Sequence, residues 1–156
     1  MEKENLECRK KAMSLLNYRD RTEWELRDKL LAGGFEEDEI EDAVEYVRSF
    51  HYIDDLRFAK RFVELHREDR SEKRLRQDLK RKHIPEEYIE IAFEEMFTDD
   101  SAAIRREIKK RLSAWDDLTE ISEKERRKIA MSLYRKGYQT SDIFREMEYL
   151  LKIDGN

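Results

Sequence analysis

Three pairs of adjacent carboxylates are the residues of this chain whose type and spacing most suggest chemistry. Neighbouring carboxylates can hold a divalent cation or share a proton in acid–base catalysis. Each pair also borders a segment expected to be helical, where an aspartate accepts hydrogen bonds from free backbone N–H groups. We therefore interpret the pairs as helix caps and predict neither a metal site nor a catalytic site there. The pairs are Asp54-Asp55, Asp99-Asp100 and Asp116-Asp117.

The other reactive side chains show no catalytic spacing. Cys8, His51, His66 and His83 do not have the spacing of zinc ligands. The chain has no glycine-rich phosphate loop, no Walker lysine and no nucleophile elbow. We expect a protein that is not an enzyme and that uses no metal and no cofactor.

Basic side chains form a more informative pattern, because they gather on the outer faces of successive expected helices. When Leu75 and Leu79 face the core, the neighbouring Lys and Arg side chains point outward. The same holds for the Lys and Arg side chains beside Ile104 and Ile108 when these two residues face the core. A solvated face with ion pairs would explain any single cluster, but several clusters together favour a continuous basic stripe for a phosphate backbone or an acidic protein surface. The candidate binding residues are Arg70, Lys73, Arg74, Arg76, Lys80, Arg81, Arg105, Arg106, Lys109, Lys110, Lys124, Arg127, Lys128 and Arg135.

The elements that position these residues come from one unit that the sequence uses three times. The segment Thr22–Glu45 aligns with Ser71–Glu94, and its apolar positions align again near the C-terminal end. Self-similarity at a fixed period is typical of repeat architectures. The aligned apolar triplets are Leu26/Leu75/Ile129, Leu30/Leu79/Leu133, Phe35/Ile84/Tyr138, Ile40/Ile89/Ile143 and Val44/Phe93/Met147.

Local signals mark the helix ends within each unit. Thr22 with Glu25, and Ser122 with Glu125, have the spacing of a capping box, in which each side chain bonds the backbone N–H of the other residue. Ser71 is the equivalent cap of the middle unit. In the first unit, the helix that Thr22 caps should bury Leu26, Leu30 and Leu31 and stop at Gly33-Gly34. His83 aligns with Gly34 and Gly137, which predicts a left-handed backbone there.

We therefore predict an all-α fold of three tandem three-helix repeats, stacked into an elongated, curved array. The expected repeats are residues 1–53, 54–100 and 101–156. A unit of about 50 residues is at the lower edge of independent stability, so neighbours should cover each other's apolar faces. Trp24, Tyr46 and Trp115 are candidates either for interface anchors or for packing within and between repeats.

Composition agrees with a charge-rich helical protein and limits its location. Hydrophobic residues make up 38% and charged residues 46% of the chain, with only four Gly and one Pro. No apolar run approaches the roughly 20 residues that span a bilayer. The N-terminus lacks an apolar signal core, and the single Cys8 cannot form an internal disulfide. We expect a cytoplasmic monomer with no membrane partner.

Charge is distributed unevenly along the repeats. Residues 1–53 carry 9 Lys and Arg against 14 Asp and Glu, and residues 54–100 carry 11 against 14. Residues 101–156 carry 13 against 10, so the C-terminal repeat is basic while the chain as a whole has a net charge of −5. This asymmetry is compatible with a nucleic-acid role but does not require one.

Three segments resemble a known family. They are Tyr18–Leu30 (YRDRTEWELRDKL) followed by Gly34-Phe35, Tyr52–Ala59 (YIDDLRFA), and Leu75–Lys82 (LRQDLKRK) leading to Ile84. Together they are similar to signatures of the RecX family, bacterial regulators of the RecA recombinase. The resemblance covers nearly the whole chain, and the segment Tyr52–Ala59 is its most specific part. His51 and His83 stand where the family often has glycine.

The resemblance implies a non-enzymatic regulator with tandem three-helix units in a crescent. Members of this family bind along the groove of a RecA filament on DNA. They typically restrain its ATPase, strand exchange and co-protease activity, in homologous recombination, DNA repair and the SOS response. The expected partners are therefore the RecA filament and, through the basic stripe, single- or double-stranded DNA. No catalytic residue is carried over.

Two other classes remain open from the sequence. The first alternative is a DNA-binding helical-repeat protein, similar to a transcription factor, that acts without a recombinase. Its recognition helix would need base-reading side chains near the N-terminus. Glu23, Glu36 and Glu86 lie near such N-termini and would repel phosphate. The second alternative is a helical scaffold with no nucleic-acid role.

Overall fold

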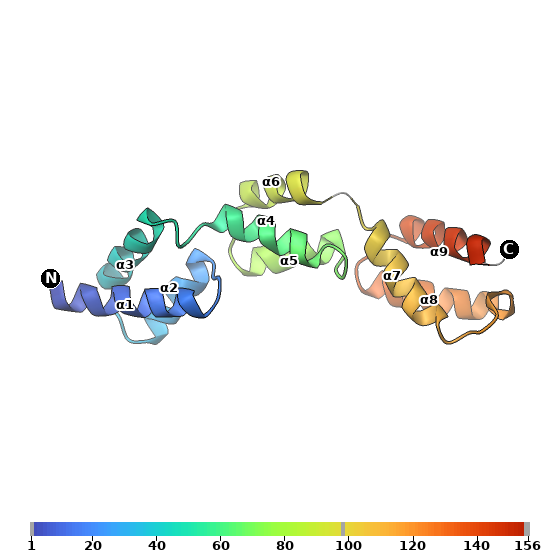
Figure 1. The fold of residues 1–156 in the computed structure, drawn as a ribbon, viewed down its shortest axis with the longest axis horizontal. Helices are drawn as coiled ribbons and strands as arrows, with labels where there is room; N and C mark the ends of the chain where they lie inside the picture. The colour runs from blue at the N-terminus through green and yellow to red at the C-terminus, as the bar shows by residue number, and fades with distance from the viewer. Residues whose placement is uncertain (1, 98, 155–156) are drawn as a thin grey trace. The chain divides into compact units, whose positions relative to one another are not determined.

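The computed structural model describes residues 2–97 and 99–154, and within them the regular structure is helical throughout (Figure 1). The prediction of an all-α fold is confirmed. We name the helix groups α1–α3, α4–α6 and α7–α9 the first, middle and third repeat. The helices are α1 (Glu2–Tyr18), α2 (Glu23–Ala32), α3 (Glu37–Ser49), α4 (Asp55–His66), α5 (Glu72–Arg81), α6 (Glu86–Met96), α7 (Ser101–Leu112), α8 (Glu123–Arg135) and α9 (Thr140–Asp154), with a 3-10 turn η1 (Leu118–Glu120) before α8.

The described residues fall into two compact units. One unit contains Met1–Phe62 and Leu79–Glu95, and the other contains Val63–Asp78 and Met96–Asn156. Both units therefore take part of α4 and part of α5. The division into repeats 1–53, 54–100 and 101–156 stays a prediction, as does the arrangement of the repeats in an array.

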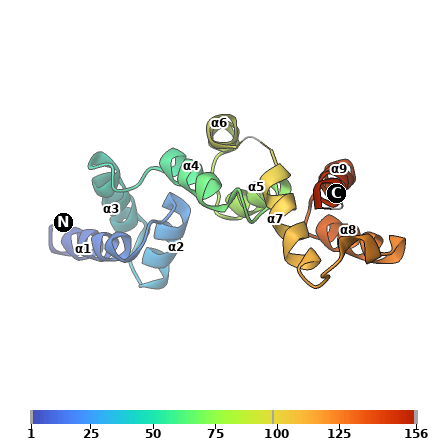
Figure 2. The same cartoon turned by 45° about the vertical axis from the view of Figure 1, so that its right-hand side comes forward.

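Each outer repeat has its own apolar core. In the first repeat, α1, α2 and α3 enclose a cluster that includes Leu26, Leu30 and Val44. In the third repeat, α7, α8 and α9 enclose the aligned residues, and α8 and α9 lie side by side in both views (Figures 1 and 2). Leu31 is the exception to the predicted pattern, because its side chain is 63% exposed. The helix turns by about 100° per residue, so Leu31 points away from the face that buries Leu30.

The same backbone turn joins the second and third helices of all three repeats. The N–H groups of Phe35, Ile84 and Tyr138 donate to the carbonyl oxygens of Leu30, Leu79 and Leu133 at 3.2 to 3.3 Å. One residue before each of these donors, the backbone is left-handed, with φ of 92° at Gly34, 59° at His83 and 101° at Gly137. The left-handed conformation predicted for His83 is confirmed.

The caps follow the sequence in part. The hydroxyls of Thr22, Ser71 and Ser122 each accept the N–H of the residue three positions on, at 3.1 to 3.2 Å. The prediction that the Glu25 carboxylate accepts the N–H of Thr22 in return is wrong, because this carboxylate instead pairs with Lys82 at 2.9 Å. A complete capping box occurs at Glu36 and Glu39, where it was not predicted. Among the described residues, no helix combines the length and the apolar character that a membrane crossing needs.

Candidate functional site

Several candidate basic residues on and beside α5 are engaged in ion pairs. Asp78 is buried and receives both Arg70 at 2.9 Å and Arg74 at 3.1 Å. Arg76 pairs with Glu72 at 3.3 Å, one turn earlier on the same helix. A guanidinium held by a buried carboxylate is a weaker candidate for phosphate binding, since leaving the pair would strand the carboxylate.

The remaining α5 candidates are more accessible. Lys80 is exposed and lies 3.9 Å from Glu86, a contact that water screens strongly. Lys73 is exposed and has no ion pair within the described part of the chain. Arg81 is also exposed.

On α7 the candidates divide into one structural and three accessible residues. Arg105 forms two hydrogen bonds to Glu146 of α9, at 2.9 and 3.3 Å, and its guanidinium lies 4.9 Å from the ring centre of Tyr149. The hydrogen bonds to Glu146 raise the pKa of Arg105 above its ordinary value. Arg106, Lys109 and Lys110 are exposed and have no ion pair among residues 2–97 and 99–154.

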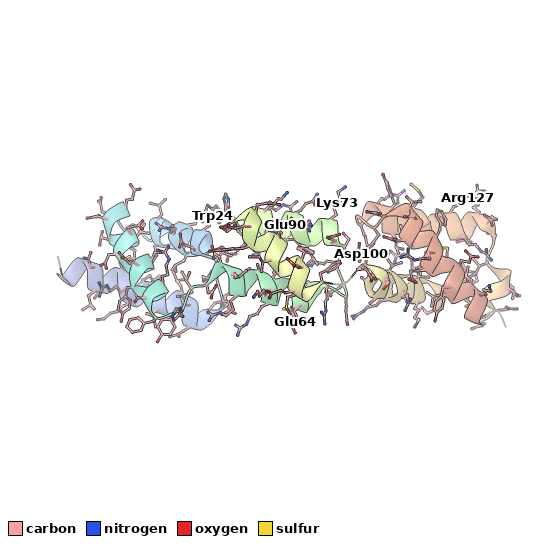
Figure 3. The ribbon with its side chains drawn as sticks, turned by 90° about the horizontal axis from the view of Figure 1, so that it is seen from above. Trp24, Glu64, Lys73, Glu90, Asp100 and Arg127 are labelled. Atoms are coloured by element: carbon pink, nitrogen blue, oxygen red, sulfur yellow. The ribbon has the colours of Figure 1, made fainter. Side chains whose placement is uncertain are left out.

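The α8 candidates are largely accessible. Lys124, Arg127 and Arg135 are exposed and without an ion pair to any described residue, while Lys128 lies 3.8 Å from Glu125. Lys73 and Arg127, both in the second compact unit, extend toward the same edge of the molecule in Figure 3. We call the candidate binding residues that are exposed and have no ion pair with another described residue the accessible cations. They are Lys73, Arg106, Lys109, Lys110, Lys124, Arg127 and Arg135.

Two of the three aspartate pairs do more than cap their own helices, whereas Asp117 accepts, among the described residues, only from Thr119 nearby. Asp54 and Asp99 cap locally, accepting the N–H of Arg57 at 3.0 Å and of Ser101 at 2.9 Å, as predicted. Asp55 instead accepts the N–H of Glu23, the first residue of α2, at 2.9 Å. The second carboxylate of the pair thus joins the start of α4 to the start of a helix in the preceding repeat.

The second junction repeats this geometry. Asp100, labelled in Figure 3 where the chain enters α7, accepts the N–H of Glu72, the first residue of α5, at 2.9 Å. Burial raises the pKa of the Asp100 carboxyl to about 6 and that of Asp55 above its ordinary value, although the backbone N–H opposes the shift in both. The Ser71 hydroxyl also donates to the carbonyl oxygen of Lys136 at 3.2 Å. Both aspartates therefore serve as structural connectors.

The histidines and the cysteine have structural surroundings. His83 stacks on Trp24 with ring centres 4.1 Å apart, so this tryptophan packs between repeats. His51 is exposed and has a left-handed backbone with φ of 60°. Burial raises the pKa of the Cys8 thiol to about 11, which keeps the thiol protonated and unreactive at neutral pH. Within the described residues, no three His, Cys, Asp or Glu side chains gather where they could hold a metal ion.

The other two aromatic candidates also pack within the fold. Tyr46 lies against the core of the first repeat and under the guanidinium of Arg9, whose carbon is 4.5 Å from the ring centre. Trp115 packs against the core of the third repeat. Of the two interpretations that the sequence left open for these aromatics, packing describes the structure.

Family models and curated proteins match this chain. Residues 8–46 match the model "RecX, first three-helix domain", and residues 54–92 match "RecX, second three-helix domain". A protein of Trichlorobacter lovleyi named regulatory protein RecX is 34% identical over 144 residues, which are 90% of this chain and 93% of that protein. A protein of the same name from Vibrio campbellii is 40% identical over 91 residues, which span 58% of this chain and only 59% of the relative's length.

Solved structures share the fold. A crystal structure of RecX from Lactobacillus salivarius superposes with a TM-score of 0.81 at 22% identity, covering 96% of this chain and 98% of that one. A crystal structure named regulatory protein RecX gives a TM-score of 0.77 at 21% identity and covers 96% of this chain and 73% of the other. At these identities the likeness establishes the fold.

Proposed function

The chain belongs to the RecX family of regulatory proteins, and from that membership we propose that it binds RecA filaments on DNA and inhibits their ATPase, strand-exchange and co-protease activities. These activities belong to recombination, DNA repair and the SOS response, and we propose a cytoplasmic location for the protein. The similarity over 90% of the chain to a regulatory protein RecX is the observation that carries the proposal. No catalytic step is assigned to the chain.

The accessible cations support a contact with a filament that contains DNA. A cation already held by a buried carboxylate gains little from phosphate, whereas an unpaired cation can replace condensed counterions. Six of the seven accessible cations, all except Lys73, lie on α7 and α8 in the repeat with net positive charge. We propose that this repeat contacts DNA phosphate or an acidic surface of the filament.

Binding to a preassembled filament tests the proposal directly. The labelled chain is titrated with cognate RecA assembled on a poly-dT oligonucleotide with a slowly hydrolysed ATP analogue. Parallel titrations use the bare oligonucleotide and RecA without DNA. Fluorescence anisotropy should show tighter binding to the filament than to either component.

Equal or tighter binding to the bare oligonucleotide would instead favour the alternative, a DNA-binding helical-repeat protein that acts without a recombinase. No binding to any of the three would favour the scaffold reading. Both results would remove the recombinase from the account.

A further inference from the structure

A groove lies between α8 and α9 on the surface of the third repeat. It has a volume of about 550 Å³, and its apolar lining comes from Phe144, Met147 and Leu151 of α9. Arg126 and Arg127 of α8 line the opposite side. Phe144 is 48% exposed, a large apolar side chain left open to water beside two guanidinium groups.

The equivalent face of the first repeat is closed by ion pairs. Arg27 of α2 contacts Glu23 at 3.2 Å and reaches across to Glu41 of α3 at 2.7 Å. Arg48 of α3 extends this chain of ion pairs by pairing with Glu23. These charged side chains cover the seam between α2 and α3 with partners from the chain itself.

The middle repeat keeps part of this arrangement. Glu72 and Arg76 align with Glu23 and Arg27 and form the same pair, at 3.3 Å. The first two repeats therefore share this ion pair at the aligned positions.

The third repeat has lost these charges at the aligned positions. When Leu26 is aligned with Ile129, the residues Glu23, Arg27, Glu41 and Arg48 fall on Arg126, Ala130, Phe144 and Leu151. One arginine replaces a glutamate, and apolar side chains replace the other three charges. The groove is thus the result of specific substitutions in a face that the chain covers elsewhere.

Arg126 shows that the groove lacks a partner. Its Nε atom is buried and has no hydrogen-bond partner among the described residues. A buried donor without an acceptor destabilises the folded protein. A ligand that brings an oxygen acceptor beside an apolar group would engage the Arg126 guanidinium and cover Phe144 together.

The charges around the groove favour a protein segment over a nucleic acid. Besides Arg126 and Arg127, the groove is lined by Lys152 and by Glu123 and Glu148, whose carboxylates would repel a polyphosphate chain. A peptide can place one carboxylate beside Arg126 and Arg127 and keep the rest of its backbone neutral. The apolar lining formed by Phe144, Met147 and Leu151 suits the apolar side chains of a peptide better than it suits nucleic-acid bases.

We propose that this groove is a docking site for a segment of the recombinase partner in which an apolar side chain neighbours a carboxylate. The apolar side chain enters between Phe144 and Leu151, and the carboxylate accepts from Arg126. This inference rests on the proposed function, since it takes the partner from there and adds the surface and the chemistry of contact.

Photo-cross-linking identifies the occupant without relying on inhibition. A benzoylphenylalanine replaces Phe144 in one full-length variant and Tyr18, which is 81% exposed on α1, in the control. Both are irradiated with cognate RecA filaments, and the adducts are mapped by mass spectrometry. We expect an adduct from position 144, in a RecA peptide with an acidic residue next to an apolar one, and little from position 18.

Adducts of position 144 with DNA or with a second copy of the chain would overturn the proposal. So would the absence of an adduct, or equal yields from positions 144 and 18. Each result is independent of whether the variant still inhibits the recombinase.

A charge-neutral graft tests the same site by function. Ala130→Arg with Phe144→Glu rebuilds the Arg27–Glu41 pair of the first repeat at the aligned positions and leaves the net charge unchanged. A control, Met131→Arg with Tyr134→Glu, makes the same charge change at exposed α8 positions outside the groove lining, whereas Ala130 itself is buried. We expect the graft to raise the half-inhibiting concentration in a RecA ATPase assay by about thirtyfold, as loss of a hot spot does, and the control to leave it unchanged.

The outcomes separate the two proposals. Inhibition by the natural chain and equal inhibition by the graft would overturn the docking site alone. No inhibition and no filament binding by the natural chain would overturn the proposed function itself. If circular dichroism shows the graft unfolded, the cross-linking result decides.

Discussion

At the scale of single residues, one left-handed position in each repeat controls the turn between its second and third helices. Gly34 and Gly137 fill this position in the outer repeats, with φ of 92° and 101°. A residue with a Cβ atom is strained there by roughly 1–2 kcal/mol. Gly137 carries a second constraint, because a Cβ atom would lie 2.7 Å from the Ser71 hydroxyl, whereas Gly34 faces open space.

This difference predicts unequal effects of the same substitution. Gly34→Ala should lower the free energy of unfolding by about 1 kcal/mol, through backbone strain alone. Gly137→Ala should lower it by about 2–3 kcal/mol, because the buried Ser71 must also give up its bond to Lys136. Urea denaturation of both variants measures the difference. Equal losses would show that the contact between Ser71 and Gly137 contributes nothing to stability.

Asp100 is the residue whose ionisation should be visible in the pH dependence of stability. Its folded-state pKa is raised to about 6 by burial, whereas an unfolded aspartate titrates near pH 4. Between these values the folded state binds more protons than the unfolded state. The contribution of Asp100 to stability therefore falls as the pH rises from about 4 to 6.

Asp100→Asn should remove this dependence while keeping an oxygen that can accept from Glu72. Relative to the natural chain, the variant should gain stability between pH 4 and pH 7, on the order of 1 kcal/mol after allowance for partial solvent exposure. Thermal unfolding across this range measures the gain.

Asp99→Asn provides a control of opposite sign. Hydrogen bonds from Ser101 lower the pKa of Asp99, so its contribution is present near neutral pH and is lost as the pH falls below about 4. Relative to the natural chain, the Asp99→Asn variant should therefore lose most stability at neutral pH. The same pH trend in both variants would contradict the assignment of Asp100 as a buried connector.

At the scale of the elements, α7 is the helix whose accessible cations are the best candidates for contact with phosphate. Lys109 and Lys110 are exposed and have no ion pair among the described residues. Each phosphate contact with single-stranded DNA contributes roughly 0.7 to the slope of log affinity against log salt. Replacing both lysines with alanine should flatten the slope by about 1.4 for a poly-dT oligonucleotide.

Lys11 and Lys29 provide a matched control for this measurement. Both are exposed in the first repeat and without an ion pair in the described chain, so their replacement by alanine removes the same charge. The control should leave the slope close to that of the natural chain. An unchanged slope in the Lys109 and Lys110 variant would exclude these residues from a DNA contact.

Sequence periodicity predicted the elements better than their connections. Aligned apolar residues such as Leu26, Leu75 and Ile129 are all buried, because helical periodicity places them on one face. The left-handed turn at His83 followed from its alignment with two glycines. The hydrogen bonds that Asp55 and Asp100 accept from other helices could not be predicted from the sequence. Local spacing identifies a capping aspartate but does not show which distant N–H group it accepts from.

The candidate basic stripe shows the same limit. Sequence placed Arg74 and Arg105 on outward faces, but it could not show that Asp78 and Glu146 hold them. The groove between α8 and α9 was also missed. The signal that could have found it is the loss of the aligned charges Arg27 and Glu41 at Ala130 and Phe144.

At the scale of the whole molecule, membership of the RecX family and the uneven charge of the repeats lead to one central claim. We propose that the chain regulates a recombinase filament by binding it directly, rather than by covering the DNA. The most direct measurement is the ATPase rate of cognate RecA on single-stranded DNA, titrated with this protein at fixed salt.

The account predicts loss of ATPase activity at protein levels well below those needed to coat the DNA. Inhibition that begins only at coating levels would indicate competition for the strand. An unchanged rate across the titration would contradict the claim that this protein inhibits RecA.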